Sequence, residues 1–386
     1  MRYLKADMIF NGEHFLQNDV VLVLNEKGVL SDISSIQKIP AENIETFEGI
    51  ICPGFINTHC HLELSHMKGL IPEKTGLVEF AKGIISKRQS VSEEEQIEKM
   101  KEADNDMKSF GIAAVGDISN SLISTGIKKE SDLYYHTFIE LIGLNPVRWE
   151  EILKQGITLL NELKQKLLPG SLAPHAPYST STELIKAIAE YDEKNELSFS
   201  IHNQESAEED AFIRGENSAF YDLYHFLKLD ISWFKPKHHS SLASYAHLLT
   251  GKRHIVVHNT FSNYRDSVFS NKTVFPCLCP TANLYIEVTL PDFKEIAHRS
   301  HNLCFGTDSL ASNHSLDILA EASCFYNHTH QLELTLKSLT SNGARALGIE
   351  TQYGYLIPGK ATGINLIEAG KHELMLKAVI SPARKS

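Results

Sequence analysis

The sequence lacks long hydrophobic runs, paired cysteines and any cluster of basic residues. No apolar stretch approaches the roughly 20 residues that a membrane-spanning helix needs, so we expect no contact with the interior of a membrane. The first residues run directly into alternating apolar and polar positions, without the apolar segment and small-residue cleavage site of a signal peptide. These absences predict a soluble, cytoplasmic protein.

The six cysteines show no zinc-finger spacing and lie in apolar or strand-like surroundings, which favours buried, reduced thiols. The formal net charge is −11, and no basic cluster is interleaved with aromatic residues. A surface of this charge does not generally attract phosphate backbones or anionic lipids, so we expect neither nucleic acid nor a membrane as partner. A small molecule fits these features better.

The pattern along the chain indicates an α/β fold. With 386 residues, the chain is longer than one hydrophobic core usually holds, which predicts a large barrel or a main domain with a smaller one. Short apolar segments rich in β-forming residues alternate with longer helix-like stretches, which is typical of repeated βα units. Eight such segments predict a closed (β/α)8 barrel, the TIM barrel. The predicted strands are 54–62, 113–119, 135–143, 172–178, 198–204, 254–260, 273–279 and 302–307, and the clearest helices are 93–110, 149–167 and 181–195.

The two ends of the chain differ from its middle. Residues 1–52 and 353–386 alternate apolar and polar positions around turn signals, so we expect them to pair as one small β-sandwich domain, leaving 53–352 for the barrel. An aromatic-rich insertion at about 206–250 separates the fifth and sixth predicted strands. Insertions of this length often form part of a substrate pocket or a lid, and surface decoration is the alternative.

Histidines and carboxylates gather at the ends of the predicted strands. His59 and His61 end the first strand, and side chains two apart on a strand share a face, so both would point into the mouth of the barrel. Barrel enzymes place catalytic groups at these C-terminal strand ends. Four more predicted strands end in such residues: His175, His202 with Glu205, His258 and Asp308.

Each of these residues alone has a purely structural interpretation: a buried histidine bonded to a backbone carbonyl, a helix-capping aspartate or a solvated glutamate. Five such coincidences at five strand ends are hard to reconcile with structural roles only. The remaining histidines that we consider lie outside these positions, and we interpret them as structural or surface residues: His136, His225, His238, His239, His254, His301, His314, His328 and His330.

The segments Pro53 to His61 and Gly306 to Ser309 resemble the first and eighth strand motifs of the amidohydrolase superfamily. The resemblance spans nearly the whole chain and looks closest to the cytosine-deaminase-like aminohydrolases, which include adenosylhomocysteine, guanine and aminodeoxyfutalosine deaminases. It implies one divalent metal ion, zinc before iron or manganese, and the fourth strand has no lysine where binuclear relatives carry a bridging one. The implied metal ligands are His59, His61, His202 and Asp308.

The resemblance also implies a mechanism. Three neutral imidazoles and a carboxylate leave an open position for water, whose pKa a metal can lower from 15.7 to about 7, giving metal-bound hydroxide. Asp308 would accept the proton of the water, and His258 would hydrogen-bond the attacking hydroxide. Glu205 would protonate a ring nitrogen and later pass a proton to the departing ammonia.

Substrate contacts are less clearly marked. By the same resemblance, His175 would recognise a heterocycle nitrogen or carbonyl and Glu79 would bind a ribose diol, although Glu79 reads equally well as a first-turn helix residue favoured by the helix dipole. Glu140 and Arg148 would bind a polar group of the substrate or form a salt bridge at the barrel rim. The seventh strand motif, which ends at Asn283, lacks the arginine and serine usual in the family, so a cationic substrate contact is missing.

Three hypotheses follow. The first is hydrolytic deamination of an amino-substituted N-heterocycle resembling a purine nucleoside, such as aminodeoxyfutalosine. The second is hydrolysis of an amide or imidazolone ring, or dechlorination, on the same scaffold. The third, a barrel that only binds, is disfavoured because every metal and acid position is present. The family resemblance further implies a homodimer or a larger assembly.

Overall fold

The computed structural model describes residues 1–236 and 238–384. Lys237, within the predicted insertion, and residues 385–386 of the predicted β domain lie outside this described part. Within it, no helix is long and apolar enough to cross a membrane. All six cysteines are free thiols in the structure, and five of them are buried, while Cys324 is partly exposed.

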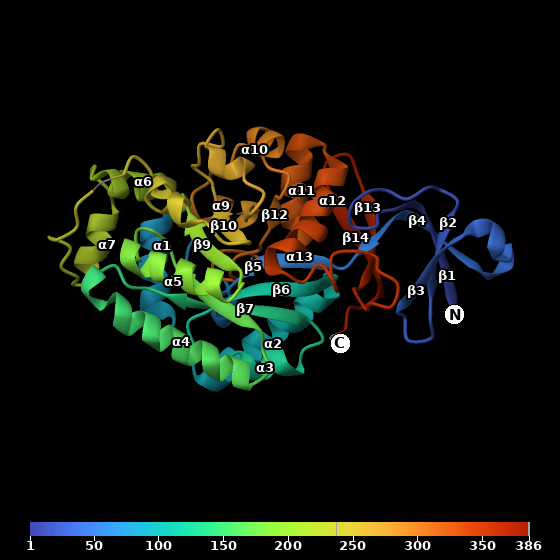
Figure 1. The fold of residues 1–386 in the computed structure, drawn as a ribbon, viewed down its shortest axis with the longest axis horizontal. Helices are drawn as coiled ribbons and strands as arrows, with labels where there is room; N and C mark the ends of the chain where they lie inside the picture. Colours follow the sequence, from blue (N-terminus) through green and yellow to red (C-terminus); the bar gives the residue numbers. More distant parts are fainter. Residues whose placement is uncertain (237, 385–386) are drawn as a thin grey trace.

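The two ends of the chain form one six-stranded sheet, at the end of the molecule where β1 to β4 lie in Figure 1. The pairing of the ends is direct, because β13 runs antiparallel to β4 with Ile364 opposite Pro53. The strand order is β14-β13-β4-β1-β2-β3, and since these strands form a single sheet, the expected sandwich stays a prediction. The strands are β1 (Arg2–Ile9), β2 (Val20–Leu24), β3 (Leu30–Ser35), β4 (Ile44–Pro53), β13 (Ile364–Ala369) and β14 (Leu374–Ser381).

Two parallel four-stranded sheets form the centre of the molecule, in the orders β5-β6-β7-β8 and β12-β11-β10-β9. Their edges approach each other twice: the backbone N–H of His202 donates to the carbonyl of His175 at 2.9 Å, and that of Thr307 donates to the carbonyl of His59 at 3.0 Å. The strands overlap the eight predicted ranges: β5 (Phe55–Cys60), β6 (Ile112–Ser119), β7 (Tyr134–Leu141), β8 (Gly170–Pro174), β9 (Phe199–Asn203), β10 (His254–His258), β11 (Val274–Leu278) and β12 (Cys304–Phe305).

Helices surround these strands (Figure 1), and the three clearest predicted helices are confirmed as α2, α4 and α5. Serine caps begin two of them, because Ser92 accepts from the N–H of Glu95 and Ser181 from that of Leu184. The helices are α1 (Leu77–Lys87), α2 (Glu93–Ser109), α3 (Thr125–Glu130), α4 (Trp149–Gln165), α5 (Thr182–Lys194), α6 (Ala207–Arg214), α7 (Phe220–Phe226), α8 (Ser241–Tyr245), α9 (Pro280–Ile286), α10 (Phe293–Arg299), α11 (Ile318–Thr329), α12 (Leu332–Leu339) and α13 (Ser341–Leu347).

The core lies between the central strands and their helices. Every residue of β5, β6 and β9 is buried, as expected for parallel strands that are covered on both faces. The apolar faces of α4 and α5 contribute Leu160, Leu163 and Ile188 to this core. Burial of each such side chain contributes about 1.5–3 kcal/mol, so this packing fixes the strand ends on which the polar residues stand.

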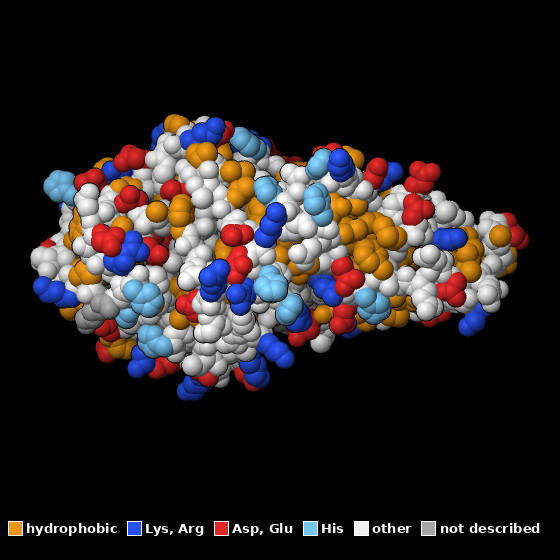
Figure 2. Space-filling model, turned by 90° about the horizontal axis from the view of Figure 1, so that it is seen from above, with side chains coloured by type: hydrophobic (Ala, Val, Ile, Leu, Met, Phe, Trp, Pro, Cys, Tyr) orange, Lys and Arg blue, Asp and Glu red, His pale blue; other side chains and the backbone are white. Residues whose placement is uncertain are grey.

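The insertion packs against the strand ends through its aromatic residues. Phe212 of α6 and Phe220 of α7 share an apolar cluster with residues of α1 and α9, and the ring of Phe220 lies 4.3 Å from that of Tyr178. In Figure 1, α6 and α7 lie at the end opposite the six-stranded sheet. On the face shown in Figure 2, acidic and basic side chains are interspersed rather than separated by sign.

Candidate active site

Four side chains converge where β5, β9 and β12 end. Nε2 of His61 lies 3.1 Å from Nε2 of His59 and 3.3 Å from Nε2 of His202. Oδ1 of Asp308 lies 3.5 Å from Nε2 of His59 and 3.3 Å from Nε2 of His61. The structure therefore brings together the four residues predicted as metal ligands.

The protonation of these groups suits a cation. Nδ1 of His202 lies 2.8 Å from the carbonyl oxygen of His175, so Nδ1 carries the proton and Nε2 presents a lone pair to the cluster. Burial lowers the pKa of His59, of His61 and of His202, which keeps the imidazoles neutral. Burial acts to raise the pKa of Asp308, but the hydrogen bond with His59 and the nearby histidines outweigh it and lower this pKa, leaving a carboxylate.

The spacing of these atoms suits a metal ion. Tetrahedral zinc with bonds of about 2.0–2.1 Å holds its ligand atoms roughly 3.3–3.4 Å apart. Four of the six separations among the four side chains, 3.1 to 3.5 Å, are close to that value. His258 also lies within 4.8 Å of His59, His202 and Asp308. We nevertheless place it outside the ligand set, because both of its ring nitrogens face other partners.

Those partners are Asn283 and Glu205. Nδ1–H of His258 donates to Oδ1 of Asn283 at 2.9 Å, which leaves Nε2 unprotonated in the neutral ring. This Nε2 lies 3.6 Å from Oε2 of Glu205. Burial lowers the pKa of His258, so the neutral ring is favoured. The arrangement leaves Nε2 as an acceptor next to a carboxyl group.

Glu205 is a buried carboxyl group whose surroundings favour its protonated form. Burial raises its pKa well above the ordinary value, and the charges of Asp308 and Glu287 raise it further. Its backbone N–H donates to Oε2 of Glu209 at 3.1 Å, which fixes the turn after β9. A carboxyl group whose pKa is raised keeps its proton to a higher pH, which is what a general acid requires.

Left-handed backbone turns aim several of these side chains. His258 has φ of 69°, Asp308 has φ of 56°, and Gln204, just before Glu205, has φ of 46°. Such conformations cost about 1–2 kcal/mol each for residues other than glycine and persist where surrounding contacts impose them. At Asp308 one such contact is the hydrogen bond from its N–H to the carbonyl of His59, at 3.2 Å.

His175 and Glu140 lie beside the cluster. Nδ1 of His175 lies 2.6 Å from Oγ of Ser179, and its ring lies 4.8 Å from that of His202. Oε2 of Glu140 accepts from Nδ2 of Asn120 at 2.8 Å. Its Oε1 lies 3.9 Å from Nδ1 of His202 and has no hydrogen-bond partner among the described residues. Glu140 thus belongs to the surroundings of the site and not to the barrel rim.

Two residues considered from the sequence lie elsewhere. Glu79 is in the first turn of α1, with its side chain 62% exposed and its Oε1 2.7 Å from Nζ of Lys82. Arg148 is 60% exposed and pairs with Glu151 at 3.0 Å. The structure does not bring either side chain to the cluster, so the helix-turn and salt-bridge interpretations describe them better.

The sequence reasoning missed several residues that hold the site. Oγ of Ser312 donates to Oδ2 of Asp308 at 2.5 Å, and Nδ2 of Asn313 donates to the carbonyl of Thr307 at 2.9 Å. Glu321 of α11 accepts from Asn313 at 2.9 Å and from both the N–H and the hydroxyl of Thr281. Polar residues after a strand are common in loops, so nothing in the sequence distinguished them.

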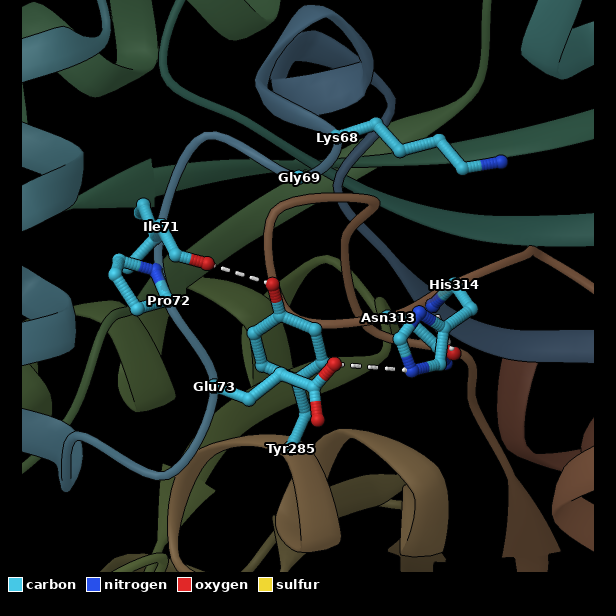
Figure 3. A pocket seen from close by; sticks show the side chains of 8 residues that line it. All are labelled: Lys68, Gly69, Ile71, Pro72, Glu73, Tyr285, Asn313 and His314. Carbon is cyan, nitrogen blue, oxygen red and sulfur yellow. Dashed lines mark hydrogen bonds and ion pairs between the residues drawn. The ribbon is translucent and has the colours of Figure 1, made fainter.

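A cavity of about 290 Å³ opens at the same strand ends (Figure 3). None of the four clustered residues lines this cavity, but two of the lining residues are linked to the cluster. Asn313 is bonded to the residue before Asp308, and Tyr285 lies two positions after Asn283. The lining includes Lys68, Ile71, Glu73, Tyr285, Asn313 and His314.

Comparison with known proteins gives consistent matches along the chain. The model of the amidohydrolase family matches residues 50–382. An adenosine deaminase of Helicobacter pylori is 27% identical over 356 residues, covering 87% of this chain and 86% of that protein. A 5'-deoxyadenosine deaminase of Methanococcus vannielii is 26% identical over 364 residues, covering 88% of this chain and 79% of that protein.

Solved structures share the fold. The Helicobacter pylori aminofutalosine deaminase in complex with methylthio-coformycin superposes with a TM-score of 0.79 at 22% identity, covering 96% of this chain and 93% of that one. A zinc-bound adenosine deaminase from Xanthomonas campestris superposes with a TM-score of 0.74 at 19% identity, covering 98% of this chain and 92% of that one.

Proposed function

We propose, from the premise that this chain belongs to the amidohydrolase family, that it hydrolytically deaminates an amino-substituted purine nucleoside. The observation that carries the proposal is the convergence of His59, His61, His202 and Asp308 at one place, where His61 lies 3.1 to 3.3 Å from each of the other three and His59 lies 3.5 Å from Asp308. The buried carboxyl group of Glu205 lies beside these residues, with its Oε2 3.6 Å from Nε2 of His258. The matched relatives named adenosine and 5'-deoxyadenosine deaminases support the choice of reaction.

The donor set of three imidazole nitrogens and one carboxylate oxygen suits one divalent metal ion, and we propose zinc held by His59, His61, His202 and Asp308. The zinc in a solved structure of the same fold supports this choice. When bound, such an ion supplies Lewis acidity that makes water nucleophilic near neutral pH.

The other groups of the site move or hold protons. Asp308 accepts the proton of the attacking water, and its Oδ2 is steadied by the hydroxyl of Ser312. Nε2 of His258, unprotonated because Nδ1–H is committed to Asn283, accepts a hydrogen bond from that water. Glu205, whose pKa burial raises, donates its proton to a purine ring nitrogen. The resulting carboxylate passes the proton that Asp308 took from water to the amino group, which leaves as ammonia, and the hydroxyl of the tetrahedral adduct returns a proton to Glu205 as the ring carbonyl forms.

We propose that His175 hydrogen-bonds a second heteroatom of the ring. Nδ1 of this residue is engaged with Ser179, so Nε2 remains available to a substrate nitrogen or carbonyl. The proposed steps require the carboxyl group of Glu205 to be shielded from water. A carboxyl group exposed to water would ionise at pH 7 and lose the proton that the ring must receive.

We further propose that the two central sheets are halves of one (β/α)8 barrel spanning residues 53–352, with 1–52 and 353–386 as the smaller β domain. Hydrogen bonds join the halves on both sides, from His202 to His175 and from Thr307 to His59. The single bridge between Cys60 and Asp308 supports the same closure. A barrel explains why groups from distant parts of the sequence meet at one mouth.

The test is ammonia release from adenosine, 5'-deoxyadenosine, 5'-methylthioadenosine, adenine and guanine by protein reconstituted with zinc. We expect rapid release from at least one nucleoside. Glu205→Gln should lower kcat about 10²–10⁴-fold, because a general acid is lost, while zinc content stays unchanged. Glu208→Gln is the matched control, since Glu208 is a half-buried glutamate three residues along whose Oε2 accepts from the N–H of Ala219.

Each alternative outcome is distinct. Ring-opened product in place of ammonia would favour the second class of hydrolysis instead. Zinc-loaded protein that releases no ammonia from any compound, or an unaffected Glu205→Gln variant, would overturn the deaminase proposal.

A further inference from the structure

The turn that joins β9 to α6 in Figure 1 carries Glu205, and a second buried glutamate, Glu209, is bonded to its backbone. Oε1 of Glu209 accepts from the N–H of Gln204 at 3.0 Å, and its Oε2 accepts from the N–H of Glu205 at 3.1 Å. The side chain of Glu209 has no exposed surface. Since a carboxyl group is costly to bury unless it is hydrogen-bonded, these contacts tie Glu209 firmly to the backbone from which Glu205 projects.

These contacts differ from the usual capping of a helix. Ser206 is the N-cap of α6, and its hydroxyl accepts from the N–H of Glu209 at 3.3 Å, which gives the pair the spacing of a capping box. In a capping box the glutamate bonds the N–H of the N-cap residue itself. Here the carboxyl group of Glu209 reaches past Ser206 to the two residues before it, of which Gln204 has the left-handed φ of 46°. Glu209 therefore stabilises a strained turn that the helix does not require.

The helix α8, which belongs to the insertion, bonds to the same group of residues. The hydroxyl of Ser241, 32 residues after Glu209, donates to Oε1 of Glu209. The backbone N–H of Ser241 donates to Oδ1 of Asp210 at 2.7 Å, and Oδ2 of Asp210 accepts from Nε2 of Gln204 at 2.9 Å. The insertion is thus joined through two neighbouring carboxyl groups to the residue that precedes Glu205.

We propose that Glu209 is a positioning residue for the general acid Glu205, and that Ser241 holds Glu209, so that the insertion sets the orientation of the acid. The proposal rests on the proposed deamination, in which Glu205 gives its proton to the ring. A general acid must lie within hydrogen-bond reach of the atom that it protonates, so a shift of this turn reduces proton transfer more than substrate binding. This role assigns α8 to the scaffold of the site and not to surface decoration.

The experiment is a double-mutant cycle of Glu205→Gln and Glu209→Gln in zinc-loaded enzyme, with adenosine, 5'-deoxyadenosine and 5'-methylthioadenosine as substrates. All three hydrogen bonds that the described residues make with the carboxyl group of Glu209 are donated to it, so the amide of Glu209→Gln turns a donor against at least one of them. We expect Glu209→Gln alone to lower kcat about 5- to 150-fold, with KM nearly unchanged. In the Glu205→Gln background the same change should alter kcat by less than about twofold, because the acid that Glu209 positions is absent.

The controls separate this effect from a general loss of structure, together with the zinc content and melting temperature of each variant. Glu208→Gln should keep the wild-type kcat, since Glu208 bonds Ala219 and not the turn. Ser241→Ala is a milder second variant, which should lower kcat about 2- to 10-fold in enzyme that retains Glu205. Its control is Ser244→Ala, because Ser244 is a buried serine of the same helix whose hydroxyl donates to the carbonyl of Ser241 at 2.6 Å.

Failure of this inference is separable from failure of the proposed function. If the zinc-loaded wild type releases no ammonia from any of the three nucleosides, the deaminase proposal fails. If Glu205→Gln lowers kcat but Glu209→Gln does not, or if Glu209→Gln lowers kcat by the same factor in both backgrounds, the positioning role of Glu209 is overturned. If Ser241→Ala matches Ser244→Ala, the insertion does not set the orientation of the acid.

Discussion

The hydrogen bond between Asn283 and His258 gives a prediction whose size follows from the structure. Both side chains are buried, and the distance of 2.9 Å joins Oδ1 of Asn283 to Nδ1 of His258. Asn283→Ala leaves a buried N–H without an acceptor, which costs about 1–3 kcal/mol, and frees the ring to place its proton on Nε2 instead. Nε2 would then no longer accept a hydrogen bond from water. If the whole cost falls on the transition state, kcat decreases about 5- to 150-fold.

The assay is steady-state ammonia release together with zinc content and the melting temperature of each variant. Asn283→Asp keeps an oxygen acceptor and should retain more activity than Asn283→Ala. Asn365→Ala is the control, because Asn365 is a buried asparagine in β13 that donates to the carbonyl of Gly111, away from the site. Asn365→Ala should lower stability without lowering kcat. A kcat of Asn283→Ala within twofold of the wild type, in protein that is folded and zinc-loaded, would refute the proposed role of His258 as an acceptor.

Three further predictions concern the metal and the buried acids. Chelation of the metal should abolish activity and lower the melting temperature, and added zinc should restore both. The His202→Ala variant should not respond to zinc. Free metal at a concentration 1,000 times its Kd adds about 4 kcal/mol to the free energy of unfolding. Because burial raises the pKa of Glu205, the pH profile of kcat/KM should decline on its alkaline side as the acid loses its proton, and a profile that stays flat up to pH 10 would contradict a protonated Glu205. Burial raises the pKa of Glu321 to about 7, above the value of about 4.3 in an unfolded chain. The folded state therefore binds this proton more tightly, so the contribution of the group is complete below about pH 4 and is lost as the pH rises to about 7, a difference of about 4 kcal/mol. Thermal denaturation should show Glu321→Gln gaining on the wild type between pH 5 and pH 8, and a constant difference would count against the prediction.

The sequence pointed to the four residues proposed as metal ligands through the family resemblance and through their positions at predicted strand ends. His59 and His61 are two residues apart, and a strand places such a pair on one face. The amidohydrolase resemblance drawn from these motifs is confirmed by the family match over residues 50–382. Strand ends were less exact: β8 ends at Pro174 and β12 has only two residues, because the chain turns there to aim polar side chains. The periodic pattern of apolar residues in the sequence does not reveal such turns.

The side of a helix or loop that faces the site could not be read from the sequence. Glu79 matched a substrate-binding position by resemblance, yet Leu77, Val78 and Phe80 are the residues of its helix that pack inward. The cavity depends on Lys68, Tyr285 and residues near 313, which no local pattern relates. Their proximity arises only when the central strands assemble, so it is a property of tertiary packing.

The junction of β4 and β5 ties the order of synthesis to the formation of the site. Gly54 alone separates β4, which pairs with β13 near the end of the chain, from β5, which carries His59. A side chain at position 54 would lie 2.7 Å from the carbonyl of Thr362 and 2.8 Å from Ala113, so the late segment packs directly on this hinge. Since a chain leaves the ribosome N-terminus first, β4 emerges with one edge bare and gains its partner only after some 300 further residues have been added. A nascent or truncated chain without residues 364–369 therefore presents an open sheet edge next to the strand that carries His59, and this edge is covered only when that segment has been added.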